Sequence, residues 1–128
     1  MSERRAKVLL IEEEPTLREI SAFRLELLGY EVHSVDSAEK ALEWLQRNQP
    51  TVMIVGQFLP GVSGVELVDR LSNDVRTSSI PVMYLSPNAD LEHVQRAFTA
   101  GAKEYLVTPY DPLVLQQKVQ QLVAVTTA

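Results

Sequence analysis

Five short apolar runs recur along the chain, each bounded by glycine, proline or charged residues. Continuous apolar runs this short are typical of β-strands that are buried on both faces of a sheet. The second run, YEVHSV, instead alternates roughly between apolar and polar positions, which favours a strand at an edge of the sheet. The predicted strands are Lys7–Ile11, Tyr30–Val35, Val52–Val55, Pro81–Leu85 and Glu104–Val107.

Between and after these runs, apolar residues recur at helical spacing, which predicts five amphipathic helices. Pro15 fits the first turn of the first helix, and Gly29 suits its end. Asp36 and Glu39 have the spacing of a capping box, so we expect Asp36 to cap the second helix. The predicted helices are Thr16–Leu28, the segment from Ala38 that ends before Pro50, Val65–Leu71, Ala89–Ala100, and a last helix that starts at Pro112 after an Asp111 cap.

Strands and helices therefore alternate strictly along the sequence. Such alternation implies right-handed crossovers and a parallel sheet that is covered by helices on both faces. A length of 128 residues suits one domain with a substantial core, and no linker, low-complexity segment or repeat interrupts the pattern. We predict a single α/β domain over residues 1–128, with an ordered core over about 6–124.

Composition narrows the classes of function. A formal net charge of −5 is a poor match to direct nucleic-acid binding, which favours basic patches. The chain has no cysteine, so disulfides and thiolate metal sites are excluded. No apolar run approaches the ~18 residues of a membrane helix, and the first run is too short for a signal peptide. We expect a cytoplasmic protein that does not bind membranes.

The carboxyl ends of parallel strands share one edge of a doubly wound sheet, where such folds place their ligands or their chemistry. Glu12 and Glu13 follow the first strand, Gly56 the third, Ser86 the fourth and Thr108 the fifth. We expect these five residues to meet at that edge. Gly56, at the end of the central strand, contributes no side chain, while the others contribute only carboxylates and hydroxyls.

Four ordered motifs resemble the receiver (CheY-like) domain of two-component response regulators. They are VLLIEEEP, PTVMIVGQFLPGVSG, IPVMYLS and GAKEYLVTPYDP, and the resemblance covers essentially the whole chain. It implies a flavodoxin-like, doubly wound sheet of five parallel strands in the order 2-1-3-4-5, with five helices. It also implies a role in phosphorelay signal transduction rather than an enzymatic one.

The same resemblance implies that the usual chemistry is missing. In the family, an aspartate at the end of the third strand attacks a phosphodonor, a divalent cation and a lysine offset the charge, and a Ser or Thr binds the phosphoryl group. Here Gly56 stands at the nucleophile position and Thr108 at the lysine position. Glu12 and Glu13 replace the usual aspartates, and only Ser86 keeps its expected type. We predict a degenerate pocket with no catalytic residue and no aspartyl phosphorylation.

Metal binding should suffer from the same changes. The extra methylene of each glutamate would misplace an oxygen that could ligate a metal. Mg²⁺ could still contact Glu13 and the main-chain carbonyl of Phe58. With fewer fixed oxygens, we expect Mg²⁺ binding to be weak or absent, and we predict no other cofactor.

Receivers commonly meet their partners through the fourth helix, fifth strand and fifth helix. Tyr105 matches the family's switch aromatic, and we predict that it stays in one rotamer because the trigger is missing. Leu113 and Val114 are adjacent apolar residues in the first turn of the last helix, where we expect both to be exposed. The resemblance implies other signalling proteins, or an output domain outside this chain, as partners, and it allows a homodimer through the same three elements.

Three functions are consistent with the sequence. The leading hypothesis is a signalling module that binds proteins independently of phosphorylation. The second is a receiver that is modified at another residue, such as Glu12, Glu13 or Ser86, which mass spectrometry of protein from its host would detect. The third is a small flavodoxin-like enzyme or nucleotide binder, but the chain lacks a glycine-rich phosphate loop after its first strand.

Overall fold

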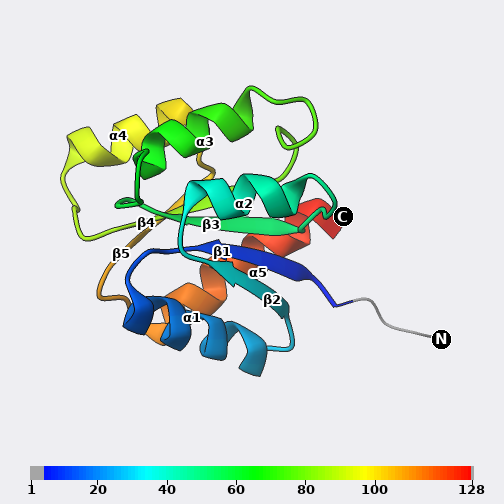
Figure 1. Cartoon of the computed structure of the whole chain (residues 1–128). Helices are drawn as coiled ribbons and strands as arrows, with labels where there is room; N and C mark the ends of the chain where they lie inside the picture. Colours follow the sequence, from blue (N-terminus) through cyan, green and yellow to red (C-terminus); the bar gives the residue numbers. More distant parts are fainter. Residues whose placement is uncertain (1–4, 128) are drawn as a thin grey trace.

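Strands and helices alternate through residues 5–127, the part of the chain that the computed structural model describes (Figure 1). Residues 1–4 and 128 of the predicted domain lie outside the described residues. The strands are β1 (Lys7–Ile11), β2 (Glu31–Val35), β3 (Val52–Gly56), β4 (Val82–Ser86) and β5 (Glu104–Val107). The helices are α1 (Pro15–Leu27), α2 (Ala38–Leu45), α3 (Gly64–Ser72), α4 (Leu91–Ala100) and α5 (Pro112–Thr127). None of these helices combines the length and the apolar character that a membrane span requires.

The five strands form one parallel sheet in the order β2-β1-β3-β4-β5. β3 lies at its centre, where Met53 pairs with Leu9 of β1 and with Val82 of β4. The predicted fold and strand order are confirmed. Because all five strands run in the same direction, their carboxyl ends share one edge, which from here on is called the carboxyl edge.

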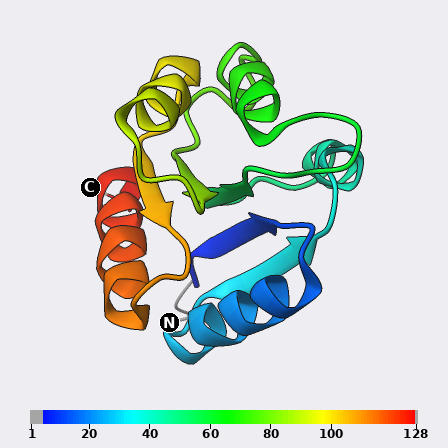
Figure 2. The same cartoon turned by 90° about the vertical axis from the view of Figure 1, so that its left-hand side faces the viewer.

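Helices cover both faces of this sheet: α2, α3 and α4 lie on one face, and α1 and α5 lie on the other (Figures 1 and 2). Side chains of the central strands alternate between the two layers. Leu9 and Met53 join the core that contains residues of α2, α3 and α4. Val8 and Ile54 join the core that contains residues of α1 and α5. Both faces of the sheet are thus buried, as continuous apolar strands require.

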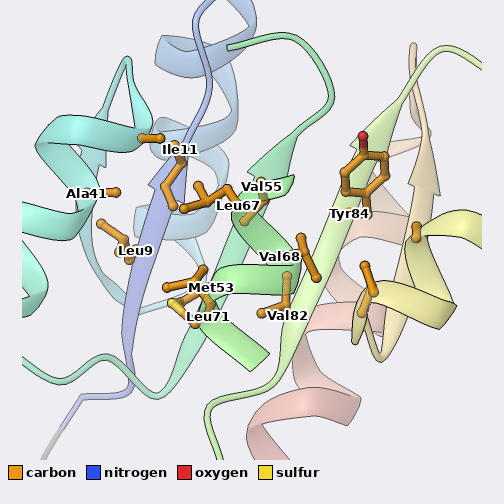
Figure 3. Packing of buried hydrophobic residues seen from close by; sticks show 14 of the residues in the cluster. Leu9, Ile11, Ala41, Met53, Val55, Leu67, Val68, Leu71, Val82 and Tyr84 are labelled. Carbon is orange, nitrogen blue, oxygen red and sulfur yellow. The ribbon is translucent and has the colours of Figure 1, made fainter. Parts of the chain in front are cut away.

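The core under α3 fixes the end of the central strand. Figure 3 shows Leu67, Val68 and Leu71 of α3 lying beside Met53 and Val55 of β3, and all five side chains are buried. Full burial of one such side chain contributes about 1.5–3 kcal/mol. This packing holds β3 and α3 together, so the loop between them starts and ends at fixed points.

Helix α2 begins with a different cap from the predicted one. Ser37 has the extended backbone of a cap residue, and its hydroxyl accepts a hydrogen bond from the N–H of Lys40 at 3.2 Å. A cap must reach the N–H two or three residues ahead of it, and Asp36 lies one position too early. The carboxylate of Asp36 instead pairs with Lys40 Nζ at 3.0 Å. The prediction of an Asp36 cap is therefore wrong.

Other boundaries differ from the prediction by one or two residues. β2 and β4 begin one residue later than expected, and β3 and β4 each run one residue further. α3 begins at Gly64 because Ser63 and Glu66 form a capping box ahead of it. α4 begins at Leu91 because the side chain of Asp90 caps it.

Candidate functional site at the carboxyl edge

The two acids that follow β1 lie in different environments. Glu12 is buried, with 7% of its surface exposed, whereas Glu13 is exposed. The guanidinium of Arg18 donates hydrogen bonds to the main-chain carbonyls of both residues, at 2.9 and 3.0 Å, and so fixes the turn between β1 and α1. The next acid, Glu14, caps α1 through its carboxylate. Of the three acids, only Glu12 brings a buried carboxylate to the carboxyl edge.

The carboxylate of Glu12 lies directly against Gly56. A β-carbon built on Gly56 would overlap Glu12 Oε1 and would lie 3.1 Å from Glu12 Cδ. Any side chain at position 56 therefore requires Glu12 to move. The space beside the end of β3 is filled by Glu12, which comes from the neighbouring strand β1.

Burial also changes the acidity of Glu12. It raises the pKa of the carboxyl above its usual value of 4.5, because a charged carboxylate loses its hydration there. A hydrogen bond from the main-chain N–H of Glu14 to Oε2, at 2.9 Å, opposes this rise in pKa. The negative charges of Glu14 and Glu13 raise the pKa further, and the positive charge of Arg18 lowers it. Glu12 thus holds its proton to a higher pH than a free glutamate would.

The loop from β3 to α3 folds back onto the end of β3. The N–H of Gly64 donates to the carbonyl of Gln57 at 2.9 Å. A β-carbon on Gly64 would overlap the carbonyl of Gly56 and would lie 2.9 Å from Tyr84 Cε1, so this close return needs glycine. Phe58, whose carbonyl is the expected metal contact, lies exposed on the same loop.

Ser86, at the end of β4, is part of a hydrogen-bond network. Its hydroxyl is buried and donates to Gln57 Oε1, which also accepts a bond from Asn88 Nδ2 at 2.9 Å. The main-chain N–H of Asn88 donates to Ser86 Oγ at 3.0 Å. These bonds join the β3–α3 loop to the β4–α4 loop. The Ser86 hydroxyl is thus engaged on both sides by neighbouring groups of the same chain.

Tyr105 and Thr108 complete the edge from β5. The ring of Tyr105 is buried, and its hydroxyl donates to the carbonyl of Asn88 at 2.6 Å. Its ring also lies beside that of Tyr84, with 5.6 Å between ring centroids. Thr108 is half-buried, and its main-chain N–H donates to the carbonyl of Ser86 at 2.9 Å. The structure therefore places Tyr105 in an inward position, tied to the β4–α4 loop.

The two apolar residues at the start of α5 differ in their surroundings. Leu113 is 56% exposed. Val114 is partly buried and packs against the core on the α1–α5 side of the sheet. The expectation that both side chains are exposed is wrong for Val114, because successive residues of a helix lie on different sides of it, and the side with Val114 faces the sheet. Leu113 alone belongs to the exposed surface.

Three residues of this edge escaped the sequence analysis. Gln57 and Asn88 build the network around Ser86, and Arg18 fixes the turn after β1. Gln57 had a detectable signal, because it is a polar residue immediately after a buried strand. Arg18 had none, since its position is that of an ordinary helix-surface cation.

The residues at the carboxyl edge form two groups. Glu12 and Gly56 meet at β1 and β3, and the network of Gln57, Ser86 and Asn88 spans β3 and β4. Among residues 5–127, no three histidine, aspartate or glutamate side chains come close enough to hold a metal ion. The edge thus supplies hydrogen-bonding groups and one buried carboxyl, with no carboxylate at the end of β3.

This fold and edge define a class of protein. The family model for the response regulator receiver domain matches residues 8–120, which is most of the chain. The chain therefore belongs to the response regulator receiver domain family, whose members are signalling modules. The predicted family is confirmed.

Individual relatives agree with this assignment. The chain is 30% identical over 105 residues to the phosphate regulon transcriptional regulatory protein PhoB of Pseudomonas aeruginosa. The matched region covers 82% of this chain and 46% of PhoB. It is 31% identical over 113 residues to the transcriptional regulatory protein CseB of Streptomyces avermitilis, covering 88% of this chain and 47% of CseB. The chain thus spans about half the length of these curated relatives. Among solved structures, the chemotaxis response regulator CheY4 of Vibrio cholerae superposes with a TM-score of 0.88 at 26% identity, over 93% of this chain and 99% of that one.

Proposed function

We propose that this domain is a degenerate receiver that acts as a protein-interaction module independently of phosphorylation at the end of β3. The observation that carries the proposal is the packing of Glu12 against Gly56. Phosphoryl transfer to a receiver needs a carboxylate nucleophile at that point, with cations that neutralise the phosphoryl oxygens. Position 56 has no side chain, and the space that a nucleophile would need holds the Glu12 carboxylate.

The other parts of the phosphorylation chemistry are also lost. Thr108, at the position where the resemblance places a lysine, provides a hydroxyl and no cation. The residues present do not fit the divalent cation that the family uses, because Glu12 is turned against Gly56 and no three histidine, aspartate or glutamate side chains among residues 5–127 converge on one point. We expect Mg²⁺ to bind weakly or not at all.

The partners we propose are other signalling proteins, or an output domain outside this chain. PhoB and CseB are named as transcriptional regulatory proteins, and the chain matches about half of each. The surface we assign to these partners comprises α4, β5 and α5, whose exposed apolar residues are Leu91, Phe98, Val107, Leu113 and Val125. Tyr105 is held inward by its bond to Asn88, which supports a surface presented in one state. A homodimer through the same surface is a further form of this proposal. The acidic chain itself is not expected to bind nucleic acid.

Modification at another residue is the second candidate, and the surroundings of the three residues separate them. Ser86 is 1% exposed, and its hydroxyl is already hydrogen-bonded to Gln57 and Asn88. Glu12 is buried against Gly56, so an incoming phosphodonor would have to displace it. Glu13 is exposed and is the one of the three that a modifying enzyme could reach without rearrangement.

A phosphodonor assay tests the chemical part of the proposal. The chain is incubated with acetyl phosphate and Mg²⁺ beside a receiver that keeps its aspartate, and intact masses are measured. We expect an acid-labile adduct on the control receiver and an unchanged mass for this chain. An acid-labile adduct on this chain would overturn the proposal, and peptide mapping would then show whether Glu13 carries it.

A pull-down from the native organism tests the interaction part. Leu113→Glu places a charge on the α5 surface, and Val75→Glu is the matched control because Val75 is 89% exposed in the loop between α3 and β4. We expect captured proteins to be lost with Leu113→Glu and kept with Val75→Glu. Equal capture by both variants would show that the docking surface lies elsewhere.

A further inference from the structure

Helix α1 carries an apolar stripe on the side that faces away from the sheet. Ser21 and Leu25 are the buried residues of this helix. Ile20, Phe23 and Leu27 are exposed at 45%, 61% and 70% and recur at helical spacing. With 3.6 residues per turn, they lie on the side of α1 opposite Leu25. Single exposed apolar residues are ordinary, but three on successive turns form a continuous patch.

Two opposite charges border this stripe. Glu19 lies along one side of it and Arg24 along the other, and with the three apolar residues they line a groove of about 360 Å³. Among residues 5–127, neither Glu19 nor Arg24 takes part in a salt bridge within the chain. The surface therefore offers an apolar centre and two unpaired charges of opposite sign.

We propose that this surface binds a second copy of the same chain, with the two α1 helices packed in parallel. The spacing of three and four residues between Ile20, Phe23 and Leu27 matches the a and d positions of a coiled-coil seam. Glu19 and Arg24 then occupy the g and e positions. In a parallel pair, a g residue faces the e residue five positions later on the other helix, so each Glu19 meets the Arg24 of the second copy.

The charges select this arrangement over the antiparallel one. In an antiparallel pair, g positions face each other, which would bring Glu19 near Glu26 of the second copy. Like charges at such short range destabilise an interface, whereas the parallel pairing forms two symmetric ion pairs. The seam is short because α1 has 13 residues, so the dimer is weak and depends on chain concentration. The inference does not depend on the proposed function, since it concerns neither the carboxyl edge nor Leu113.

Sedimentation velocity over a range of chain concentrations, up to millimolar, tests the dimer. We expect the intact chain to shift from monomer to dimer as concentration rises. Phe23→Glu should weaken association by roughly a hundredfold, because it places a charge in the centre of the seam. Arg24→Glu should weaken it by roughly tenfold, because it replaces two ion pairs with two repulsions. The double variant Glu19→Arg/Arg24→Glu restores opposite charges and should recover most of the affinity.

Single cysteines test the parallel orientation. The chain has no cysteine of its own, so each introduced thiol is the only one present. In a parallel pair, every residue along the seam meets its own copy. Thr16→Cys and Leu27→Cys lie near opposite ends of α1, and both should form disulfide-linked dimers on mild oxidation. An antiparallel pair would separate both thiols from their own copies and would cross-link neither efficiently.

Three results would overturn the inference. The first is a chain that stays monomeric at the highest concentration. The second is a dimer that Leu113→Glu disrupts but Phe23→Glu leaves unchanged, which would assign association to the surface of α4, β5 and α5. The third is a failure of the charge-swapped double variant to recover association although it unfolds at the same temperature as the intact chain. That last result would show that Glu19 and Arg24 do not pair between the two copies.

Discussion

The contact between Glu12 and Gly56 can be measured by a double-mutant cycle. Gly56→Ala adds the β-carbon that overlaps Glu12 Oε1, and Glu12→Ala removes the overlapping group. Gly56 has no positive φ, so its backbone suits alanine. The other near neighbour of the new methyl group is the carbonyl oxygen of Ile11 at 3.4 Å, which is close to ordinary contact. The effect of Gly56→Ala should therefore be decided by Glu12.

The change in the free energy of unfolding caused by Gly56→Ala is the sum of two opposing effects. Replacing glycine by alanine at a compatible position stabilises a protein by ~0.4–1 kcal/mol, because the unfolded chain loses conformational freedom. With Glu12 present, the methyl group displaces a buried carboxylate and breaks its bond to the N–H of Glu14, which costs about 1.5–3 kcal/mol for a charged acceptor. We expect Gly56→Ala to destabilise the intact chain by about 1 kcal/mol and to stabilise the Glu12→Ala variant by about 0.5 kcal/mol. The coupling free energy is then about 1.5 kcal/mol.

Urea unfolding of the four proteins at neutral pH gives the cycle. Trp44 is the only tryptophan, and its ring stacks on His33 with 4.7 Å between centroids, so its fluorescence should report loss of tertiary packing. Far-UV circular dichroism provides a second probe, and coincident transitions would support two-state analysis. If Gly56→Ala changes stability equally in both backgrounds, within about 0.3 kcal/mol, the carboxylate does not lie against Gly56 and our account of this edge is refuted.

Three further predictions concern the pKa of Glu12, the network around Ser86 and the cap of α2. Burial raises the pKa of Glu12 in the folded state, so the folded chain binds the proton more tightly, and the free energy of unfolding should fall as pH rises from 4.5 through the folded pKa. Glu12→Gln should lack this loss in urea titrations across that range, and parallel pH profiles of the two proteins would contradict the assignment. Gln57→Ala removes the acceptor shared by Ser86 and Asn88, so hydrogen exchange should become roughly tenfold faster in the β4–α4 loop, while unchanged exchange would show that the network does not hold this loop. Ser37→Ala should lower the free energy of unfolding, measured by thermal unfolding, by about 1 kcal/mol through loss of the cap, and Asp36→Ala should lower it by less. A larger loss for Asp36→Ala than for Ser37→Ala would restore Asp36 as the cap.

The fold could be predicted because apolar runs and breakers carry most of the information about a parallel sheet. Val52–Val55 is apolar at every position, and this property alone separates a strand buried on both faces from the alternating edge strand near His33. The same pattern places Glu12 and Gly56 at one edge. It cannot place the Glu12 carboxylate against Gly56, because that contact depends on a side-chain rotamer and on the turn that Arg18 fixes.

The remaining errors have similar physical causes. Asp36 and Ser37 are both good cap residues, and only the backbone at Ser37 decides between them. Val114 is apolar like Leu113, but the angle at which α5 meets the sheet determines which of the two is buried. Gln57 is far from Ser86 and Asn88 in sequence, so the contacts that join these three residues could not be deduced from spacing.

The packing of Glu12 against Gly56 has a consequence for how this domain can change over evolution. A carboxylate at position 56 and the present placement of Glu12 exclude each other, because both would occupy the same space. A new side chain at position 56 therefore first displaces the Glu12 carboxylate from the place where it now packs. Regaining a nucleophile would require the Glu12 side chain to move to another rotamer, and Thr108 would still contribute no cation. The packing of Glu12 from β1 against the end of β3 thus favours retention of glycine at position 56.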